Sequence, residues 1–113
     1  LAVPGSASTR HLLDANALAA LPDGALVVNV ARGPVVDTEA LLAELMSGRL
    51  RAALDVTDPE PLPEGHPLWG APNTIITAHQ GGNTDAVYPR VAALIRRQLE
   101  HVLAGEPLEN VVS

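Results

Sequence analysis

The sequence has no cysteine, no lysine and no phenylalanine, and aromatic residues make up 2% of its 113 residues. Without cysteine there is neither a disulfide framework nor a thiolate metal site, which fits the cytosol, so we expect a cytoplasmic location. The formal net charge is −6, and the chain lacks the basic patch that general nucleic-acid binding requires. No apolar run reaches the roughly 18 residues that cross a bilayer, so we expect no membrane partner either.

Hydrophobic residues make up 47% of the chain, which is enough for a modest core and too much for a disordered protein. Most of them are alanine, leucine and valine, so the core is expected to be aliphatic. The chain starts at Leu1, without a methionine and without the basic segment of a signal peptide. We therefore expect a piece of a longer protein.

Short apolar runs alternate with helical patterns along the chain. We predict strands over residues 26–30, 52–56 and 73–77, and the tail of a fourth strand over Leu1–Val3. Helices are expected over residues 15–20, from Asp37 or Thr38 to Met46, and over 85–103, with glycines at 48 and 105 as stop signals. This alternation predicts an α/β fold with a parallel sheet covered by helices on both faces.

Polar side chains follow three of the predicted strands. Arg32 comes directly after the first, Asp55 and then Glu60 after the second, and His79 after the third. Ligands of open parallel sheets bind at the carboxyl ends of the strands, so these four side chains are expected to converge there. Arginine holds carboxylates in a bidentate fork, histidine moves protons near neutral pH, and a carboxylate beside the histidine orients it.

Each of these residues also has a purely structural interpretation. Arg32 could cap the sheet edge or pair with Asp37, Asp55 could serve a turn, and Glu60 lies in a proline-rich loop where most carboxylates are solvated. His79 could be a hydrogen-bonded loop histidine. We interpret the remaining histidines as structural or solvated: His11, His66 and His101. No metal site is expected, because no two histidines in the sequence have the spacing of metal ligands.

Three sequence blocks resemble the D-isomer-specific 2-hydroxyacid dehydrogenases, in the order and spacing of that family. The first is Asn29–Asp37 (NVARGPVVD) followed by Glu39-Ala40-Leu41, and the second is Leu54–Pro63 (LDVTDPEPLP) followed by His66–Trp69. The third is Pro72–Gly82 (PNTIITAHQGG). Two departures are Ala78, where the family usually has a proline before the histidine, and Pro89 early in the last helix.

The resemblance implies a role for each matching residue. Arg32 would bind the substrate carboxylate, His79 would be the general acid/base, and Glu60 the acid paired with it. Asp55 would contact the nicotinamide carboxamide. A glutamate at 60 favours hydroxyacid chemistry, because the related formate dehydrogenases place glutamine there. The cofactor would also be lined by Val3, Val30, Ala31, Arg32, His79, Gln80, Gly81 and Gly82.

The resemblance also implies the fold and the partners. Residues 1–83 would be the second half of a doubly wound, Rossmann-like dinucleotide-binding domain, and 84–113 a helix and tail that return to a substrate domain. The Gly-x-Gly-x-x-Gly turn that receives the pyrophosphate is not in this sequence. The cofactor would be NAD, with NADP not excluded, and the substrate a small 2-oxo or 2-hydroxy acid.

We expect the full-length protein to be a homodimer, and the 113 residues alone to be inactive. Two alternatives stay open. The parent could be an NAD-responsive binding protein like the C-terminal-binding-protein corepressors, which keep the same Arg, Glu and His pattern. The chain could also be an inactive truncated remnant.

Overall fold

The computed structural model describes residues 1–111. The chain separates into two compact units, one over Leu1–Gly81 and one that begins at Gly82. In the described residues, none of the helices combines the length and the hydrophobicity that crossing a membrane requires.

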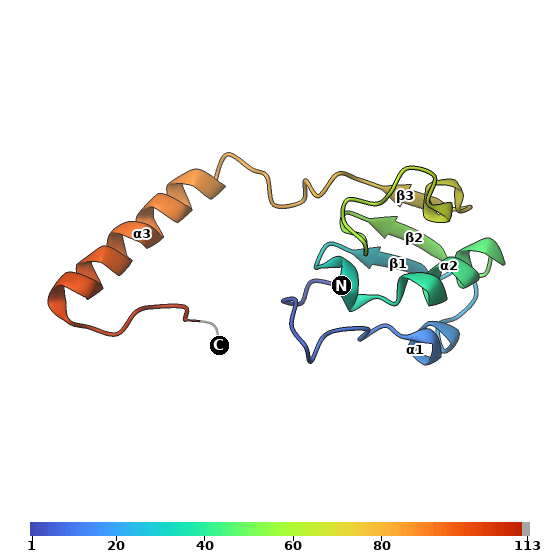
Figure 1. Ribbon diagram of the computed structural model, residues 1–113, viewed down its shortest axis with the longest axis horizontal. Coiled ribbons are helices and arrows are strands. Elements are labelled where there is room, and N and C mark those ends of the chain that lie inside the picture. The colour runs from blue at the N-terminus through green and yellow to red at the C-terminus, as the bar shows by residue number, and fades with distance from the viewer. Residues whose placement is uncertain (112–113) are drawn as a thin grey trace. The chain divides into compact units, whose positions relative to one another are not determined.

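The first unit is built on a parallel sheet of three short strands (Figure 1). They are β1 (Leu26–Asn29), β2 (Arg51–Leu54) and β3 (Thr74–Ile76), in the order β1-β2-β3. The register pairs Val28 with Ala53 and Ala53 with Ile75. Because all strands run the same way, their carboxyl ends lie along one edge of the sheet. The predicted strands are confirmed, each one or more residues shorter than expected.

Two helices pack on this sheet: α1 precedes β1, and α2 connects β1 to β2. In α1 (Ala15–Ala19) the Asp14 carboxylate accepts from the Ala17 N–H at 2.9 Å, and in α2 (Thr38–Met46) Asp37 accepts from the Ala40 N–H at 3.1 Å. These are N-caps that satisfy otherwise unpaired backbone donors. Gly48 follows α2 with a φ of 74°, which suits a helix C-terminus. Both helices and their caps agree with the sequence prediction.

The core lies between these helices and one face of the sheet. Leu18 of α1 and Leu41 and Leu45 of α2 are almost fully buried against alternate strand residues. The strand residues that face them are Val27, Ala52 and Leu54. Leu62 and Leu68 extend the same core toward β3, the latter from the 3₁₀ turn η2 (Pro67–Gly70). A second 3₁₀ turn, η1 (Gly33–Val35), follows β1.

Arg49 ties the ends of α1 and α2 together. Its guanidinium donates to the Leu18 and Leu21 carbonyl oxygens and to the Glu44 carboxylate, each at 2.6 Å. The hydrogen bond from Arg49 lowers the pKa of the Glu44 carboxyl below its usual range. A three-way arginine contact of this kind fixes the turn that leads into β2.

The expectation that both faces of the sheet are covered is wrong for the described residues. Burial alternates along β1 and β2, so that every second residue is exposed or only partly buried. Leu26, Val28 and Ile75 are 51%, 40% and 66% exposed on the uncovered face. The reason is that α1 and α2 both pack on the same side of the sheet (Figure 1).

The prediction of a strand over Leu1–Val3 is also wrong. Only Leu1 pairs with β1: its amino group donates to the Val28 carbonyl oxygen at 2.6 Å, and its own carbonyl oxygen accepts from the Val30 N–H at 3.2 Å. The segment nevertheless begins alongside β1.

The second unit contains α3 (Val87–Ala104) and a tail that folds back on it. Pro89 lies in the first turn of α3, the one part of a helix interior that tolerates proline, and Gly105 ends it with a φ of 68°. Gln98 exchanges two hydrogen bonds with the backbone of Glu109, at 2.6 and 3.0 Å. The helix predicted over 85–103 is therefore confirmed, with its bounds shifted by one or two residues.

Candidate active site

The edge of the sheet at the strand carboxyl ends collects the polar residues singled out in the sequence. Arg32 follows β1, Asp55 follows β2, and His79 follows β3 by three residues. The turn after β1 packs directly on the loop after β2. A Cβ placed on Gly33 would lie 1.9 Å from the Thr57 carbonyl oxygen. This contact brings the Arg32 turn against the segment that carries Glu60.

The turn that presents Arg32 is held from inside by Asn29. This side chain is 1% exposed; its Oδ1 accepts from the Ala31 N–H and its Nδ2 donates to the Arg32 carbonyl oxygen, both at 3.0 Å. The Arg32 side chain itself is exposed, and its Nη1 donates to the Ala31 carbonyl oxygen at 2.7 Å. Arg32 does not pair with Asp37, which caps α2 instead.

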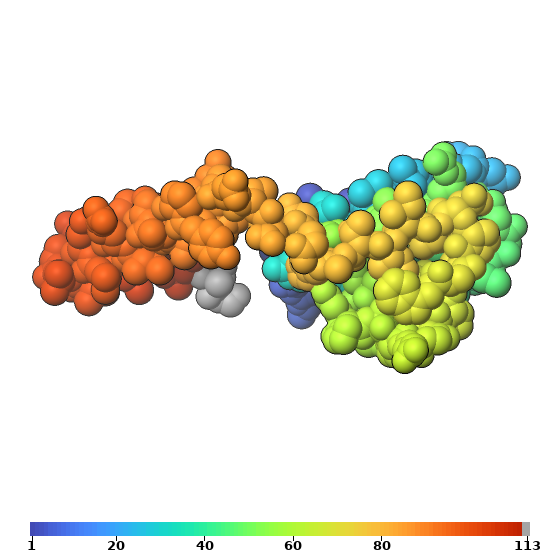
Figure 2. Space-filling view, turned by 90° about the horizontal axis from the view of Figure 1, so that it is seen from above, coloured from blue at the N-terminus to red at the C-terminus, as the bar shows by residue number. Residues whose placement is uncertain are grey.

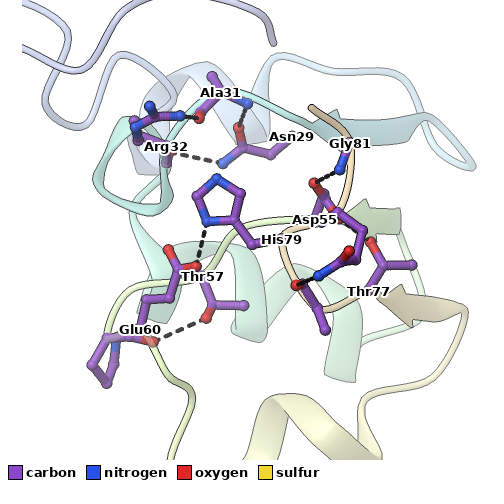
Figure 3. A network of polar contacts seen from close by, with 12 residues as sticks. Asn29, Ala31, Arg32, Asp55, Thr57, Glu60, Thr77, His79 and Gly81 are labelled. Carbon is purple, nitrogen blue, oxygen red and sulfur yellow. Dashed lines mark hydrogen bonds and ion pairs between the residues drawn. The ribbon is translucent and has the colours of Figure 1, made fainter. Parts of the chain in front are cut away.

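Glu60 and His79 are in direct contact. Their Oε1 and Nδ1 atoms are 2.6 Å apart, and both side chains remain partly open to solvent, at 39% and 44% exposed (Figure 3). The two residues are 19 positions apart and come from different loops. Within the described residues, no hydrogen bond engages His79 Nε2. The ring is therefore anchored through one nitrogen and free at the other.

A hollow of about 230 Å³ adjoins this pair. Its apolar wall is formed by Leu62, Trp69, Ile76 and Ala78, beside Glu60 and His79. The Trp69 Nε1–H donates to the Pro63 carbonyl oxygen at 3.0 Å, which fixes the indole over the loop. In Figure 2 this loop forms a continuous bulge, coloured yellow-green, on one side of the first unit.

Asp55 lies beneath the histidine loop and is 8% exposed. Its carboxylate accepts hydrogen bonds from the Thr77 hydroxyl, from the Gln80 N–H at 2.9 Å and from the Gly81 N–H at 2.7 Å. These bonds, with the one from Thr77 the largest cause, lower the pKa of Asp55 below its usual range. Asp55 is thus a fixed anion at the sheet edge.

The candidate cofactor-lining residues have different surroundings. Val3 is partly exposed and follows the segment that pairs with β1, and Val30 is 53% exposed at the end of that strand. A Cβ on Gly5 would lie 3.0 Å from the Arg32 side chain, so this segment runs to the same edge. Ala31 is buried, and Gln80 donates to the Ala78 carbonyl oxygen at 3.0 Å. Gly82 begins the second unit.

The other histidines have structural contacts, as the sequence interpretation held. His11 lies 3.7 Å from the Asp37 carboxylate, His66 accepts from the Leu68 N–H in η2, and His101 lies 2.7 Å from the Pro107 carbonyl oxygen. Over residues 1–111, no group of three or more His, Cys, Asp or Glu side chains is placed to hold a metal ion.

Sequence reasoning missed Asn29 and Thr77 as contributors to this site. Asn29 is an amide inside an otherwise apolar strand, and a buried polar side chain needs a hydrogen-bond partner, so its position was a usable signal. Thr77 gave no such signal, because threonine is common in strands. Its contact with Asp55 depends on the register of β2 against β3.

The fold and the site together define a Rossmann-like α/β protein with a histidine–carboxylate pair at the ligand-binding edge of its sheet. The profile of the D-isomer specific 2-hydroxyacid dehydrogenase NAD binding domain matches residues 1–81. The chain therefore belongs to the D-isomer-specific 2-hydroxyacid dehydrogenase family.

Several known proteins align with almost the whole length of this chain. A D-isomer specific 2-hydroxyacid dehydrogenase from Xanthobacter autotrophicus Py2, solved with NADPH and MES, is 45% identical with a TM-score of 0.88, over 99% of this chain and 46% of its own. A glyoxylate reductase from Thermofilum pendens is 43% identical over 92% of this chain and 31% of its own length. A D-3-phosphoglycerate dehydrogenase from Methanocaldococcus jannaschii is 40% identical over 100% and 22%. The chain spans less than half of each.

Proposed function

We propose that this chain forms the catalytic half of an oxidoreductase that interconverts 2-oxo acids and 2-hydroxy acids with NAD, NADP not being excluded. The observation that carries the proposal is the contact between His79 Nδ1 and Glu60 Oε1 at 2.6 Å, on the sheet edge that also presents Arg32. Two of the relatives are named as a glyoxylate reductase and a D-3-phosphoglycerate dehydrogenase, which supports a substrate of this class.

The proton transfer follows from this geometry. Glu60 accepts from Nδ1–H of His79 and fixes the ring, so that Nε2 is the atom that gives a proton to the substrate carbonyl oxygen during reduction. In the oxidative direction Nε2 takes the proton back from the hydroxyl. Arg32 forms no ion pair among the described residues, so its guanidinium is available to bind the substrate carboxylate in a fork and to orient the 2-oxo group.

The residues at this edge fit the nicotinamide end of the cofactor. Asp55 accepts three hydrogen bonds from the loop that carries His79, two at Oδ1 and one at Oδ2, which leaves Oδ2 one further acceptor position for the carboxamide N–H₂. The other residues proposed to line it are Val3, Val30, Ala31, Arg32, His79, Gln80, Gly81 and Gly82. The bound cofactor supplies the hydride. The chain offers no glycine-rich turn for the pyrophosphate, so that end must be bound elsewhere.

The remaining expectations belong to the whole protein. We propose a cytoplasmic homodimer in which residues 84–113 return to a substrate domain. The isolated 113 residues are proposed to be inactive, because holding cofactor and substrate in place contributes up to roughly 7 to 11 kcal/mol of barrier lowering. The glycine-rich turn that would bind the pyrophosphate end of the cofactor is not in this sequence.

A chimaera tests the proposed function. The aligned segment of the Thermofilum pendens glyoxylate reductase is replaced by this chain, and the oxidation of NADH and NADPH is followed with glyoxylate. We expect turnover, and a loss of about 100-fold or more in kcat for His79→Ala, which is the usual size of a general-acid contribution. Arg32→Leu should raise KM for glyoxylate, because the carboxylate loses its partner.

Glu64→Gln is the matched control for Glu60→Gln, because Glu64 lies exposed in the same loop. Glu60→Gln should lower kcat, whereas Glu64→Gln should leave it unchanged. A folded chimaera that turns over equally well with and without the His79 ring would refute the proposed function.

A further inference from the structure

We propose that Asp55 is a positioning residue for His79, and that Asp55, Thr77 and Gly81 form a clamp that aims the imidazole at Glu60. The inference deepens the proposed function, since it concerns how the proposed acid/base is held. The clamp consists of side-chain and backbone contacts within Leu1–Gly81.

The Asp55 carboxylate is hydrogen-bonded to the chain on both sides of His79. Before His79, the Thr77 hydroxyl donates to Asp55 Oδ1; after it, the N–H groups of Gln80 and Gly81 donate to Oδ1 and Oδ2. In Figure 3 the Asp55 carboxylate lies between Thr77 and Gly81, at the base of the loop that carries His79. One buried carboxylate therefore fixes the residues that precede and follow the histidine.

The backbone of His79 needs such a constraint. Its φ is 52°, in the left-handed region that residues other than glycine seldom adopt. A residue in this region persists where its surroundings over-determine the conformation. The two N–H bonds to Asp55 come directly after His79 and supply that constraint. With the backbone so turned, Nδ1 lies 2.6 Å from Glu60 Oε1.

The register of β2 against β3 brings Asp55 opposite Thr77. Leu54 pairs with Ile76, and the Thr77 N–H donates to the Leu54 carbonyl oxygen at 2.9 Å, so Asp55 and Thr77 are the next opposed pair. Position 81 also favours glycine. A Cβ there would lie 2.9 Å from Asp55 Oδ2, too close for the short bond to the Gly81 N–H to remain.

NMR of the 113-residue chain at neutral pH tests the clamp. The readouts are amide hydrogen exchange at Gln80 and Gly81, the Cα and Cβ shifts that report the left-handed backbone of His79, and the ring ¹⁵N shifts that report the Nδ1 bond. Asp55→Asn is compared with Asp58→Asn, whose half-buried carboxylate lies 3.9 Å from Arg10 and outside the clamp.

In Asp55→Asn we expect both amides to exchange at least about tenfold faster, because bonds to an ionised acceptor are the stronger kind. The His79 shifts should leave their left-handed values, and the ring should lose the signature of its bond to Glu60. Asp58→Asn should match the parent chain. Unchanged His79 shifts and exchange in a folded Asp55→Asn variant would overturn the proposal.

Thr77 gives a second test, with a substitution that changes no charge and is small enough for the variant to fold. Thr77→Val removes only the hydroxyl and should speed exchange at Gln80 by about threefold, less than Asp55→Asn, because both N–H bonds to the ionised carboxylate remain. Thr77→Ser restores the hydroxyl and should restore slow exchange. If Val and Ser behave alike, Thr77 is not part of the clamp.

These readouts separate the clamp from the proposed function. They report loop geometry without substrate or turnover, so the clamp can fail while the chimaera remains active. Equally, an inactive chimaera leaves the NMR result standing.

Discussion

The carboxylate of Asp55 makes folding stability depend on pH in a defined direction. Its pKa is lowered in the folded chain, chiefly by the Thr77 hydroxyl and then by the N–H groups of Gln80 and Gly81. The folded state thus binds this proton less readily than the unfolded state, in which the pKa is about 3.9. The stabilisation is complete above about pH 4 and is lost as the pH falls through the lower, folded value.

We therefore predict that the free energy of unfolding decreases below about pH 4, and that Asp55→Asn flattens this part of the curve. Urea unfolding between pH 2 and 7 measures it. Asp58→Asn serves as the control. An identical acid limb in the parent chain and in Asp55→Asn would show that the hydrogen bonds to Asp55 do not favour its charged form.

Gly33 sets a steric limit at the Arg32 turn. The Cβ of Gly33→Ala would lie 1.9 Å from the Thr57 carbonyl oxygen and 2.8 Å from the Asp58 nitrogen, which are backbone atoms that cannot rotate away. We predict a destabilisation of about 3 kcal/mol, the upper part of the range for overpacking. Gly70→Ala, where nothing lies within 4 Å, should be tolerated. Thermal unfolding compares the two, and equal Tm values would contradict the contact.

Residue types and spacing were enough to predict that Glu60 and His79 share one site. The rule that ligand-binding residues follow parallel strands placed both at the same edge. The clamp around Asp55 could not be predicted, because it depends on the left-handed backbone of His79 and on the register that opposes Asp55 to Thr77. Neither property is encoded in a local pattern.

Among the elements, α2 depends on its N-cap. Asp37 Oδ1 accepts from the Ala40 N–H, and Leu41 and Leu45 of the same helix are core residues. Asp37→Ala should lower the free energy of unfolding by about 1 kcal/mol, whereas Asp37→Asn should retain most of the cap. Chemical denaturation distinguishes them. Equal losses in both variants would assign the effect to charge instead of the cap.

The helices were predicted more accurately than the sheet faces. Asp14, Asp37, Gly48 and Gly105 are local signals, and each marks a helix end in the structure. Coverage of a sheet face is not local, because it depends on which side each connection takes. The apolar runs at 26–30 and 73–77 therefore predicted strands correctly and predicted their two-sided burial wrongly.

At the scale of the whole molecule, two observations belong together: one face of the sheet is exposed, and the chain aligns with only part of each relative. Val28 and Ile75 remain exposed on a face that parallel α/β sheets normally cover. The chain aligns with 46% or less of the relatives compared above. The proposed acid/base pair, Arg32 and the residues proposed for the nicotinamide end are present in this sequence, whereas a glycine-rich turn for the pyrophosphate is not.

Chemical rescue tests the proposed role of His79 most directly. In the glyoxylate reductase chimaera, His79→Ala should lose about 100-fold or more in kcat, and added imidazole should restore at least about tenfold of it saturably. Imidazole should not raise the rate of the parent chimaera or of Arg32→Leu. A His79→Ala chimaera that keeps its full rate, or an imidazole effect equal in all three proteins, would contradict proton transfer by His79.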